Sequence, residues 1–566
     1  MVEVCREKAL KSECMPFTAI PHNSRLFLDF LFQFDNVKSF YAHRPHGQAV
    51  LEYARTLVAA VPVAQGNASP PAAGAGYART LEFPAERRAQ VADVLERQNR
   101  LWGASQATLD SIEKFRQGAV ACISGQQVGV FGGPLYSVLK ACSALQMAEE
   151  LTGEGVPAIP VFWLATEDHD LAEIASVTMR NGCELEKLTA TSEQNGAGGP
   201  VGPIALDSHM EEMVAKAAKL LGPGWVSDAL RESYRAGETF GSAFARLFTR
   251  VLAGTGMVLV DPLDDELHRI AQPLFTAAAE RAEELDEALL ERGKALHKAG
   301  YHEQVRVTPE STLLFALEGH KRTVLHLAGN EFMVGAQRVA RGEMLSRIAE
   351  HPEQFSPNVL LRPVVQDYLF PTAVYFGGPA EIAYFAQAAV VYEKLLGRAT
   401  PVMPRLSATI VSPAMSALLE RYKLSFSDLF HGSAQVCELL ASRVLAPELQ
   451  ATLRGTEETL KVHFEALRAE LKCLDPTLVD AAARSERKML YQLHKIGGKA
   501  ARAELRKNEP LTRDAHRVLT ELFPHKELQE RVLPGIYFLA QYGPELIGIL
   551  KEAAAPQCPG HQIIRL

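Results

Sequence analysis

Apolar runs of strand length alternate with helical patterns through most of the chain. Five runs have the pattern of buried strands, at residues 119–124, 157–165, 256–261, 372–376 and 400–404. Patterns of helical length lie between or after them, at residues 134–151, 265–293 and 379–397. Strands separated by helices are typical of a parallel sheet covered on both faces, so the alternation predicts an α/β core.

The texture changes between residues 304 and 334, where short alternating runs are separated by turn residues. This pattern predicts an antiparallel insertion, which makes the α/β core discontinuous along the chain. The predicted units are residues 1–84 (N-terminal helical segment and loop), 85–300 (first part of the core), 301–345 (antiparallel insertion), 346–435 (second part of the core), 436–510 (helical coiled coil) and 511–566 (C-terminal segment packing back on the core).

A further apolar pattern predicts the coiled coil. Its leucines and phenylalanine step by four and three residues, which keeps one seam on a helix: Leu460, Phe464, Leu467, Leu471, Leu474 and Leu478. Asp475 and Pro476 interrupt the pattern as a helix-start signal, so two helices can fold back on each other. The seam predicts an antiparallel coiled coil that supports a homodimer; the alternative is an ordinary hairpin in a monomer.

Composition narrows the class of protein. With 59 Lys and Arg against 67 Asp and Glu, the net charge of −8 gives no global attraction to a phosphate backbone, so no nucleic-acid partner is expected. No apolar run approaches the roughly 20 residues that span a bilayer, and the charged N-terminus differs from a signal peptide. Eight scattered cysteines without a C-x-x-C pair indicate reduced thiols. These features predict a cytoplasmic protein without a membrane partner.

The tetrapeptide Phe-Gly-Gly-Pro occurs twice, at residues 131–134 and 376–379, each time after a predicted strand and before a predicted helix. Unpaired N–H groups and the helix dipole make such a helix start a favoured anion site. The alternative is a tight strand-to-helix turn without a ligand. The connection before the first copy also holds Ser124, Gly125, Gln126, Gln127 and Gly129. It matches neither G-x-G-x-x-G nor a P-loop.

A cluster of charged residues follows the second predicted strand. Glu167, Asp168, His169 and Asp170 come where a parallel strand ends, which is the usual place for a site in this architecture. Carboxylates beside an imidazole can orient it, so His169 is a candidate general base or acid. A metal cluster or a solvated acidic turn are the alternatives. Four consecutive residues of an extended strand cannot all reach one ion, and no metal is predicted.

Three further stretches carry candidate binding residues. Arg362 offers a guanidinium for a carboxylate or phosphate just before the second tetrapeptide, although a structural ion pair is the alternative. The full set of these candidates is Tyr301, His302, Gln304, Arg362, Gln366, Asp367, Gly377, Gly378, Glu381 and Arg405.

These segments together resemble one family. The stretches ISGQQVGVFGGPLYSVLKA, PVFWLATEDHDLAEI, GYHEQV, SPNVLLRPVVQDYLFPTAVYFGGPAEIAYFAQ, MPRLSATIV, LDPTLVDAA and QERVLPGIYFLAQYG are similar, in order, to the bacillithiol biosynthesis cysteine-adding enzymes. The resemblance covers nearly the whole chain from residue 24 onward. It implies a Rossmann-type core like that of class I aminoacyl-tRNA synthetases, with connecting-peptide insertions and a coiled coil that supports a dimer.

The resemblance also implies a reaction, the joining of cysteine to glucosaminyl-malate in the last step of bacillithiol synthesis, with ATP as the activating nucleotide. Under this interpretation Ser124 to Gly133 and Tyr136 hold the nucleotide or the activated carboxyl. Asp168 or Asp170 binds the cysteine ammonium, His169 assists deprotonation of the sugar amine, and Arg362 or Arg405 holds the malyl carboxylates. The synthetase signatures HIGH and KMSKS are absent from the sequence. The alternatives are another amino-acid-activating nucleotidyl-transfer enzyme and a non-catalytic scaffold dimer.

Overall fold

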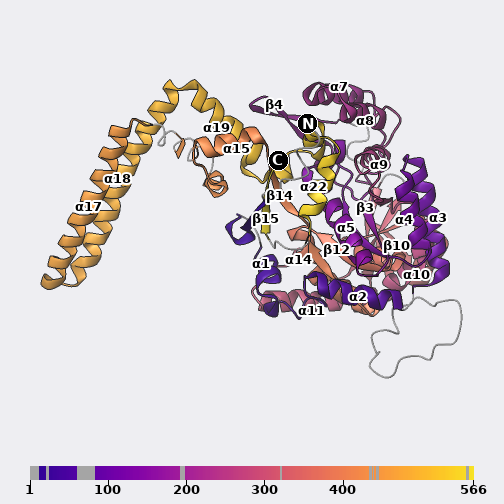
Figure 1. Cartoon of the computed structure of the whole chain (residues 1–566). Helices are drawn as coiled ribbons and strands as arrows, with labels where there is room; N and C mark the ends of the chain where they lie inside the picture. Colours follow the sequence, from indigo (N-terminus) through magenta and orange to yellow (C-terminus); the bar gives the residue numbers. More distant parts are fainter. Residues whose placement is uncertain are drawn as a thin grey trace.

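A five-stranded parallel sheet forms the centre of the main body (Figure 1). The computed structural model describes residues 12–20, 24–59, 83–190, 198–318, 321–431, 436, 439–440, 445–555 and 560–566. The strands are β2 (Val120–Gln126), β3 (Ala158–Leu164), β6 (Val258–Val260), β12 (Thr372–Gly377) and β13 (Val402–Pro404). All five strands predicted from the apolar runs are present, and every neighbouring pair is parallel.

The strand order is β13-β12-β2-β3-β6, so the first strand of the sheet lies at its centre. From β2 the chain first builds outward through β3 and β6, and then returns to the other side of β2 with β12 and β13. Numbered along the chain this order is 3-2-1-4-5, that of a doubly wound Rossmann-type sheet, whose topological switch point falls between β2 and β12. Both Phe-Gly-Gly-Pro segments follow these two central strands, which explains why the same turn occurs twice.

Both faces of the sheet are buried. Val120 and Cys122 of β2 join one core cluster together with α5 (Leu135–Gly153), whereas Ala121 and Ile123 join a second cluster on the opposite face. The second cluster holds helices α3 (Ala85–Leu101), α10 (Asp265–Glu280) and α14 (Pro379–Leu396). Successive side chains of a strand point to opposite faces, so the continuous apolar runs are the consequence of this double cover.

A second five-stranded sheet is inserted between β6 and β12. Its order is β10-β9-β8-β7-β11, with β7 (Ser311–Glu318), β8 (Lys321–Ala328), β9 (Glu331–Val334), β10 (Gln337–Ala340) and β11 (Phe355–Pro357), and each pair is antiparallel. An antiparallel sheet therefore interrupts the core, and its strand β11 lies beyond residue 345, where the insertion was expected to end. Helix α11 (Ala282–Lys298) precedes it, and α12 (Arg341–Glu350) lies between β10 and β11.

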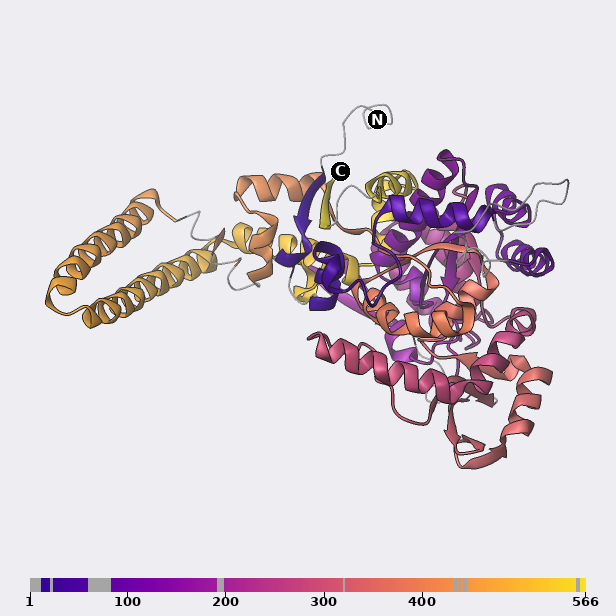
Figure 2. The same cartoon turned by 90° about the horizontal axis from the view of Figure 1, so that it is seen from below.

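Two long helices form a hairpin that projects from the body (Figures 1 and 2). They are α17 (Pro447–Leu474) and α18 (Thr477–Lys507), joined by a short turn in which Asp475 accepts hydrogen bonds from Thr477. Of the predicted seam, Phe464 is buried, whereas Leu467, Leu474 and Leu478 are exposed, so the prediction of one buried seam is wrong at these three positions. Ala482 of α18 is also buried, and further exposed apolar residues of the hairpin are Val462, Met489, Tyr491 and Ile496.

A third, three-stranded sheet was not predicted. It joins β1 (Ser12–Pro16), β15 (Gly560–Arg565) and β14 (Ser407–Val411), so both ends of the described chain meet beside the segment that follows β13. Between hairpin and β15, helices α20 (Gln529–Val532), α21 (Gly535–Tyr542) and α22 (Glu545–Ala553) pack against α5.

Among the cysteines that the structure describes, Cys14 departs from the expectation. Cys122 and Cys142 are buried free thiols, and Cys183 and Cys473 are also free, but Cys14 is disulfide-bonded. The prediction of reduced thiols is therefore wrong for Cys14. A helix with the length and apolarity needed to cross a membrane is not found in the described part of the chain.

Candidate active site

A polar cavity of about 700 Å³ opens at the carboxyl ends of β2, β3 and β12. The end of β2 contributes Gly125 and Gln126, and the turn after β12 contributes Gly378 and Pro379. The inserted antiparallel sheet covers it from the other side through Phe315 and its neighbours on β7 and β8. The cavity therefore lies at the topological switch point of the sheet, where ligands of open α/β proteins bind.

The cavity carries both signs of charge, with an excess of cations. Its cationic side chains are Lys140, Arg306, Arg322, Arg362, Arg405 and Arg531, and its carboxylates are Glu167, Asp168, Glu173 and Glu381. Ten of the predicted site residues line it: Gly125, Gln126, Gln127, Tyr136, Asp168, His169, Arg362, Gly378, Glu381 and Arg405. Six cations against four carboxylates make this cavity suited to a ligand that is anionic overall.

The first Phe-Gly-Gly-Pro corner does not face the cavity. Gly132 and Gly133 are buried with positive φ angles of 86° and 67°, and a Cβ on Gly132 would contact α9 (Phe240–Val251). The first amide of α5, the Leu135 N–H, donates to the Leu533 carbonyl at 2.8 Å. The interpretation of this corner as a phosphate site is therefore contradicted: the two glycines make a tight turn, and a distant part of the chain occupies the first helix donor.

The second Phe-Gly-Gly-Pro corner borders the cavity, but the nearby Glu381 already accepts the hydrogen bond of its free N–H group. Pro379 occupies the first position of α14, and the Gly378 N–H donates to Glu381 Oε2 at 2.7 Å. Tyr375 donates to the other carboxylate oxygen at 2.6 Å, and the Lys140 ammonium lies 2.5 Å from Oε2. Burial alone would raise the pKa of Glu381, but Lys140 and these hydrogen bonds outweigh it and lower that pKa.

Lys140 is the cation at the centre of the switch point, and the sequence analysis missed it. Its Nζ donates to the Gly125 carbonyl at 2.7 Å and to Gln126 Oε1 at 2.8 Å, besides its ion pair with Glu381. The lysine thus joins the end of β2 to the start of α14. Burial lowers its pKa, and Glu381 opposes that effect. One signal was available, because Lys140 is the only charge in an apolar helix stretch and stands four residues after Tyr136.

Arg362 presents a guanidinium to the cavity from the start of α13 (Arg362–Leu369). It donates to the Tyr384 hydroxyl at 2.9 Å and lies over the Tyr375 ring. Burial acts to lower its pKa, but Tyr384, Tyr375 and Glu381 outweigh burial and raise it, so the group stays charged. Among the described residues no carboxylate forms an ion pair with it within 4.0 Å. A partly buried charge of this kind is suited to pair with an anionic ligand.

Residues of the charged turn after β3 have two different roles: some line the cavity, and one caps a helix. Gln127 donates to Asp168 Oδ2 at 2.6 Å. His169 Nδ1 lies 3.5 Å from Asp168 Oδ1 and also 3.5 Å from Arg322 Nη1. Asp170 instead accepts the Glu173 N–H as the N-cap of the short helix that follows, and it does not line the cavity. The structure therefore places Asp170 at a helix start and not in the cavity lining, where its catalytic role was expected.

Glu167 also lines the cavity. It belongs to the charged turn described from the sequence, but it was not predicted as a site residue. It is buried, with 5% relative exposure, and its Oε1 lies 3.7 Å from the buried imidazole of His268. Arg322, which donates to the Pro357 carbonyl at 2.6 Å, comes from the inserted sheet and was not predicted at all. Only the folded insertion brings it to this strand end.

Several of the other predicted binding residues make structural contacts outside the cavity lining. Ser124 donates to the Phe376 carbonyl and ties β2 to β12, and Gly129 is buried beneath Tyr234. Tyr301 donates to Asp29, and the Gln304 N–H donates to Gln387. The complete set placed away from the lining is Ser124, Gly129, Gly132, Gly133, Asp170, Tyr301, His302, Gln304, Gln366, Asp367 and Gly377.

Asp367 illustrates why these residues drew attention. Its buried carboxylate pairs with Arg398 at 3.4 Å, and the Arg398 guanidinium also donates to the Asp367 carbonyl at 2.9 Å. Gln366 is fully buried and donates to Asp367 at 3.3 Å. A polar residue that satisfies a buried charge cannot be told from a ligand-binding residue by sequence alone.

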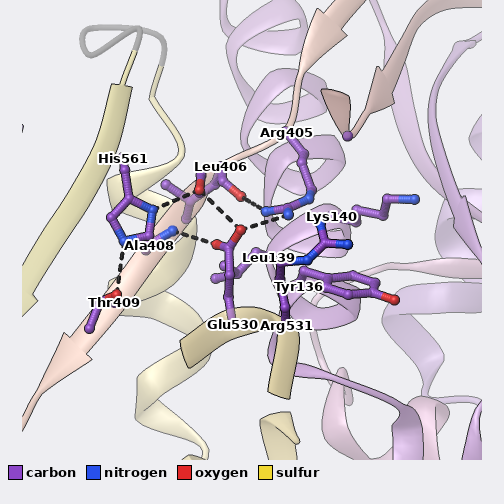
Figure 3. Close-up of polar contacts among 12 residues, drawn as sticks. Tyr136, Leu139, Lys140, Arg405, Leu406, Ala408, Thr409, Glu530, Arg531 and His561 are labelled. Atoms are coloured by element: carbon purple, nitrogen blue, oxygen red, sulfur yellow. Dashed lines mark hydrogen bonds and ion pairs between the residues drawn. The ribbon is translucent and has the colours of Figure 1, made fainter. Parts of the chain in front are cut away.

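Arg405 reaches the cavity from the segment between β13 and β14, and a buried polar cluster holds it (Figure 3). Its Nη2 donates to Glu530 Oε1 at 2.7 Å, and its Nη1 donates to the Leu406 carbonyl at 2.6 Å. Glu530 also accepts the Ser407 hydroxyl at 3.0 Å and the Ala408 N–H at 2.7 Å. Burial acts to raise the pKa of Glu530, but Arg405 and the other donors outweigh it and lower that pKa.

The same cluster fixes one tautomer of His561. Ser407 has a single hydroxyl proton, which it gives to the carboxylate, so His561 Nδ1 must donate to Ser407 across 2.7 Å. His561 Nε2 then accepts from the Thr409 hydroxyl at 2.8 Å. Burial lowers the pKa of this fully buried imidazole to about 4, so it is neutral at physiological pH.

We expect this neutral histidine to make the fold sensitive to acid. An unfolded histidine binds a proton near pH 6.5, whereas His561 resists one until about pH 4, so acidification through this window removes about 3 kcal/mol of stability. Urea unfolding midpoints of the wild type and His561→Gln, measured from pH 7 to pH 4, test this. The variant should lose less stability over the window. Equal acid sensitivity of the two proteins would show that His561 is not held neutral.

No group of three or more His, Cys, Asp or Glu side chains with metal-binding geometry occurs in the described ranges. The doubly wound sheet, its charged cavity at the switch point and the projecting helical hairpin define a Rossmann-like enzyme with a C-terminal coiled coil. Two family models match it: bacillithiol biosynthesis BshC, N-terminal Rossmann-like domain, over residues 10–406, and the C-terminal coiled-coil domain of BshC over residues 408–566. The chain therefore belongs to the BshC family of bacillithiol biosynthesis, as the sequence resemblance indicated.

Relatives match along the whole length. The protein of Koribacter versatilis is 43% identical over 555 residues, covering 98% of this chain and 99% of the relative. That of Solibacter usitatus is 37% identical over 556 residues, covering 97% and 99%, and that of Salinibacter ruber is 32% identical over 550 residues, covering 95% and 96%. All three are named "Putative cysteine ligase BshC". The chain is thus a ligase.

Among solved structures, an arginyl tRNA synthetase-like protein of Campylobacter jejuni matches with a TM-score of 0.21 and 10% identity, over 83% of this chain and 98% of that one. Likeness at this level carries no argument about what the chain binds.

Proposed function

We propose that the cavity at the switch point joins cysteine to glucosaminyl-malate through an amide bond, as the last step of bacillithiol synthesis. The observation that carries the proposal is the arrangement of charge around one polar cavity. Glu167 and Asp168 lie at the end of β3, where an amino-acid ammonium can pair with a carboxylate. Arg362 supplies a guanidinium without a carboxylate partner among the described residues, which is suited to a malyl carboxylate.

His169 is the proposed proton acceptor. The amine nitrogen of the sugar attacks the activated carbonyl carbon of cysteine, the bond to the leaving group breaks, and the proton lost from the amine passes to the imidazole. Asp168 lies 3.5 Å from His169 Nδ1 and orients the ring. The ring is more than half exposed at the cavity, so a substrate can reach its other nitrogen.

ATP is the proposed source of activation, because an amide does not form from a free carboxylate without an activated acyl group. Phosphates would meet the cations of the cavity and not the first glycine corner, since that corner is buried. We also propose that the exposed apolar residues of α17 and α18 are covered by a second copy of the chain, which makes a homodimer.

Incubation of the purified protein with glucosaminyl-malate, cysteine and ATP tests the proposal, with the ligated thiol measured by mass spectrometry. Product should appear only with a nucleoside triphosphate, and serine should replace cysteine poorly. Absence of product with every nucleotide offered would contradict the proposed reaction and favour another amino-acid-activating enzyme or a scaffold.

Two neighbouring carboxylates provide a matched comparison in this assay. Asp168→Asn should lower kcat by about 10²-fold, because the charge beside His169 is lost. Asp170→Asn should leave the rate within about threefold of the wild type, because asparagine caps a helix as well as aspartate does. Equal losses in the two variants would contradict the assignment of His169.

A further inference from the structure

Two neighbouring charged residues of helix α20 point in different directions. Glu530 is 1% exposed and points into the buried cluster with Arg405, whereas the Arg531 side chain is 54% exposed and lines the cavity. Figure 3 shows the Arg531 guanidinium on the side of Tyr136, with Glu530 turned toward Ala408 and His561. This short helix belongs to the segment matched by the coiled-coil family model, not by the Rossmann-like one.

The position of α20 is fixed by several buried hydrogen bonds. Glu530 accepts from Arg405, Ser407 and the Ala408 N–H, as described above. Its neighbour Gln529 pairs with both backbone groups of Ile410, accepting the N–H at 2.8 Å and donating to the carbonyl at 2.9 Å. Helix α20 therefore cannot shift along β14 without breaking buried polar contacts, each of which is costly to leave unpaired.

The two arginines differ in how their charges are balanced. The Arg405 guanidinium forms an ion pair with Glu530 at 2.7 Å and donates a hydrogen bond to the Leu406 carbonyl. Arg531 has one ion-pair partner among the described residues, the exposed Glu527 at 3.8 Å, which is too long for a hydrogen bond. Both arginines act on the Tyr136 hydroxyl, whose pKa burial raises and the two guanidinium groups lower. Arg531 therefore supplies the positive charge that remains available to a ligand beside Tyr136.

We propose that Arg531 binds an anionic group of the substrate, a carboxylate or a phosphate, and that the buried pair of Glu530 and Arg405 positions it. The C-terminal segment then contributes directly to the active site of the Rossmann-like domain, in addition to carrying the hairpin. This inference rests on the proposed function only for the identity of the substrate. The carboxylate would come from the malyl group and the phosphate from ATP.

Equilibrium binding tests the proposal without requiring turnover. L-malate serves as the carboxylate probe and inorganic pyrophosphate as the phosphate probe, each titrated into the full-length protein by calorimetry. Arg531→Gln should weaken one of the two by about tenfold to a hundredfold, the range for a hydrogen bond between charged groups. The probe that is affected identifies the source of the anionic group. Arg531→Lys should restore part of the affinity, because it keeps the charge and loses the planar fork.

Lys526→Gln is the matched control, since Lys526 is an exposed cation of the same segment that does not line the cavity. It should bind both probes as the wild type does. The proposal is overturned if Arg531→Gln and Lys526→Gln bind equally, or if the wild type binds neither probe at millimolar concentration.

Glu530→Gln tests the positioning role separately. It keeps the shape of the side chain and removes the charge that holds Arg405. In the ligation assay it should raise KM for the substrate whose anion Arg531 binds, with kcat little changed, provided that circular dichroism shows a folded protein. A loss confined to kcat, or an unchanged KM, would contradict positioning. If the variant does not fold, Ser407→Ala, which removes one of the hydrogen bonds that hold Glu530 and does not line the cavity, should raise the same KM to a smaller extent.

Discussion

Replacement of Arg362 by methionine is expected to lower kcat/KM for ligation by about 10²- to 10³-fold. The guanidinium faces the cavity, it donates hydrogen bonds to the Tyr384 hydroxyl and to Gln366 Oε1, and no described carboxylate pairs with it. Loss of a desolvated charge that pairs with a substrate carboxylate costs about 2–5 kcal/mol in binding. Steady-state kinetics with glucosaminyl-malate as the varied substrate measure the effect.

Two variants control this experiment. Arg362→Lys keeps a charge but not the fork, and we expect it to recover only part of the activity. Arg338→Met removes an exposed arginine of β10 that pairs with Glu331 on the surface, and it should have no effect. If Arg362→Met keeps more than about a third of the wild-type kcat/KM, the carboxylate is bound elsewhere.

Replacement of Lys140 by methionine is expected to destabilise the core by about 3–5 kcal/mol, because it leaves the Glu381 carboxylate buried without its counter-charge. Glu381 would keep only its hydrogen bonds from Gly378 and Tyr375. The double variant Lys140→Met/Glu381→Gln removes both charges and should recover most of the loss. Urea unfolding midpoints, followed by circular dichroism, measure the three proteins.

The exposed pair of Lys461 and Glu457 on α17 is the matched comparison, because the two residues have the same chemistry in water. Lys461→Met should change stability by less than about 1 kcal/mol. If Lys140→Met and Lys461→Met have similar effects, or if the double variant is no more stable than Lys140→Met alone, the buried pair does not hold the switch point together.

The parallel core was predictable because each of its strands is buried on both faces. A strand such as β3, in which every residue from Ala158 to Leu164 is buried, leaves a continuous apolar run in the sequence. The hairpin was predictable for a similar reason, since its seam repeats at helical spacing. The three-stranded sheet of β1, β15 and β14 was missed because its strands pair across the full length of the chain, and no local pattern records such pairing.

At the two Phe-Gly-Gly-Pro corners the sequence predicted the turn but not whether the helix start is open to a ligand. Both turns follow the central strands, as their shared pattern indicated, but the partner of each first donor could not be predicted. The Leu135 N–H meets a carbonyl from Leu533, about four hundred residues later, and the Gly378 N–H meets the nearby Glu381. Whether a helix start is open to a ligand depends on what the rest of the chain places over it.

The cavity residues that were missed share a cause. Arg322 comes from the inserted sheet and Arg531 from the C-terminal segment, and neither follows a strand of the parallel sheet in the sequence. Chain order predicts residues that follow strands of the parallel sheet, such as Asp168 after β3 and Arg405 after β13, but not side chains that an insertion or a distant segment brings over the sheet. Lys140 could have been found from its isolated charge in an apolar helix.

A crystal structure of the protein with bound glucosaminyl-malate tests the central claim most directly. The account predicts the ligand in the cavity between the ends of β2 and β12, with a malyl carboxylate within hydrogen-bond distance of Arg362 or Arg531. A ligand bound outside this cavity, for example in the groove that Glu184, Arg502 and Arg513 help to line, would contradict it.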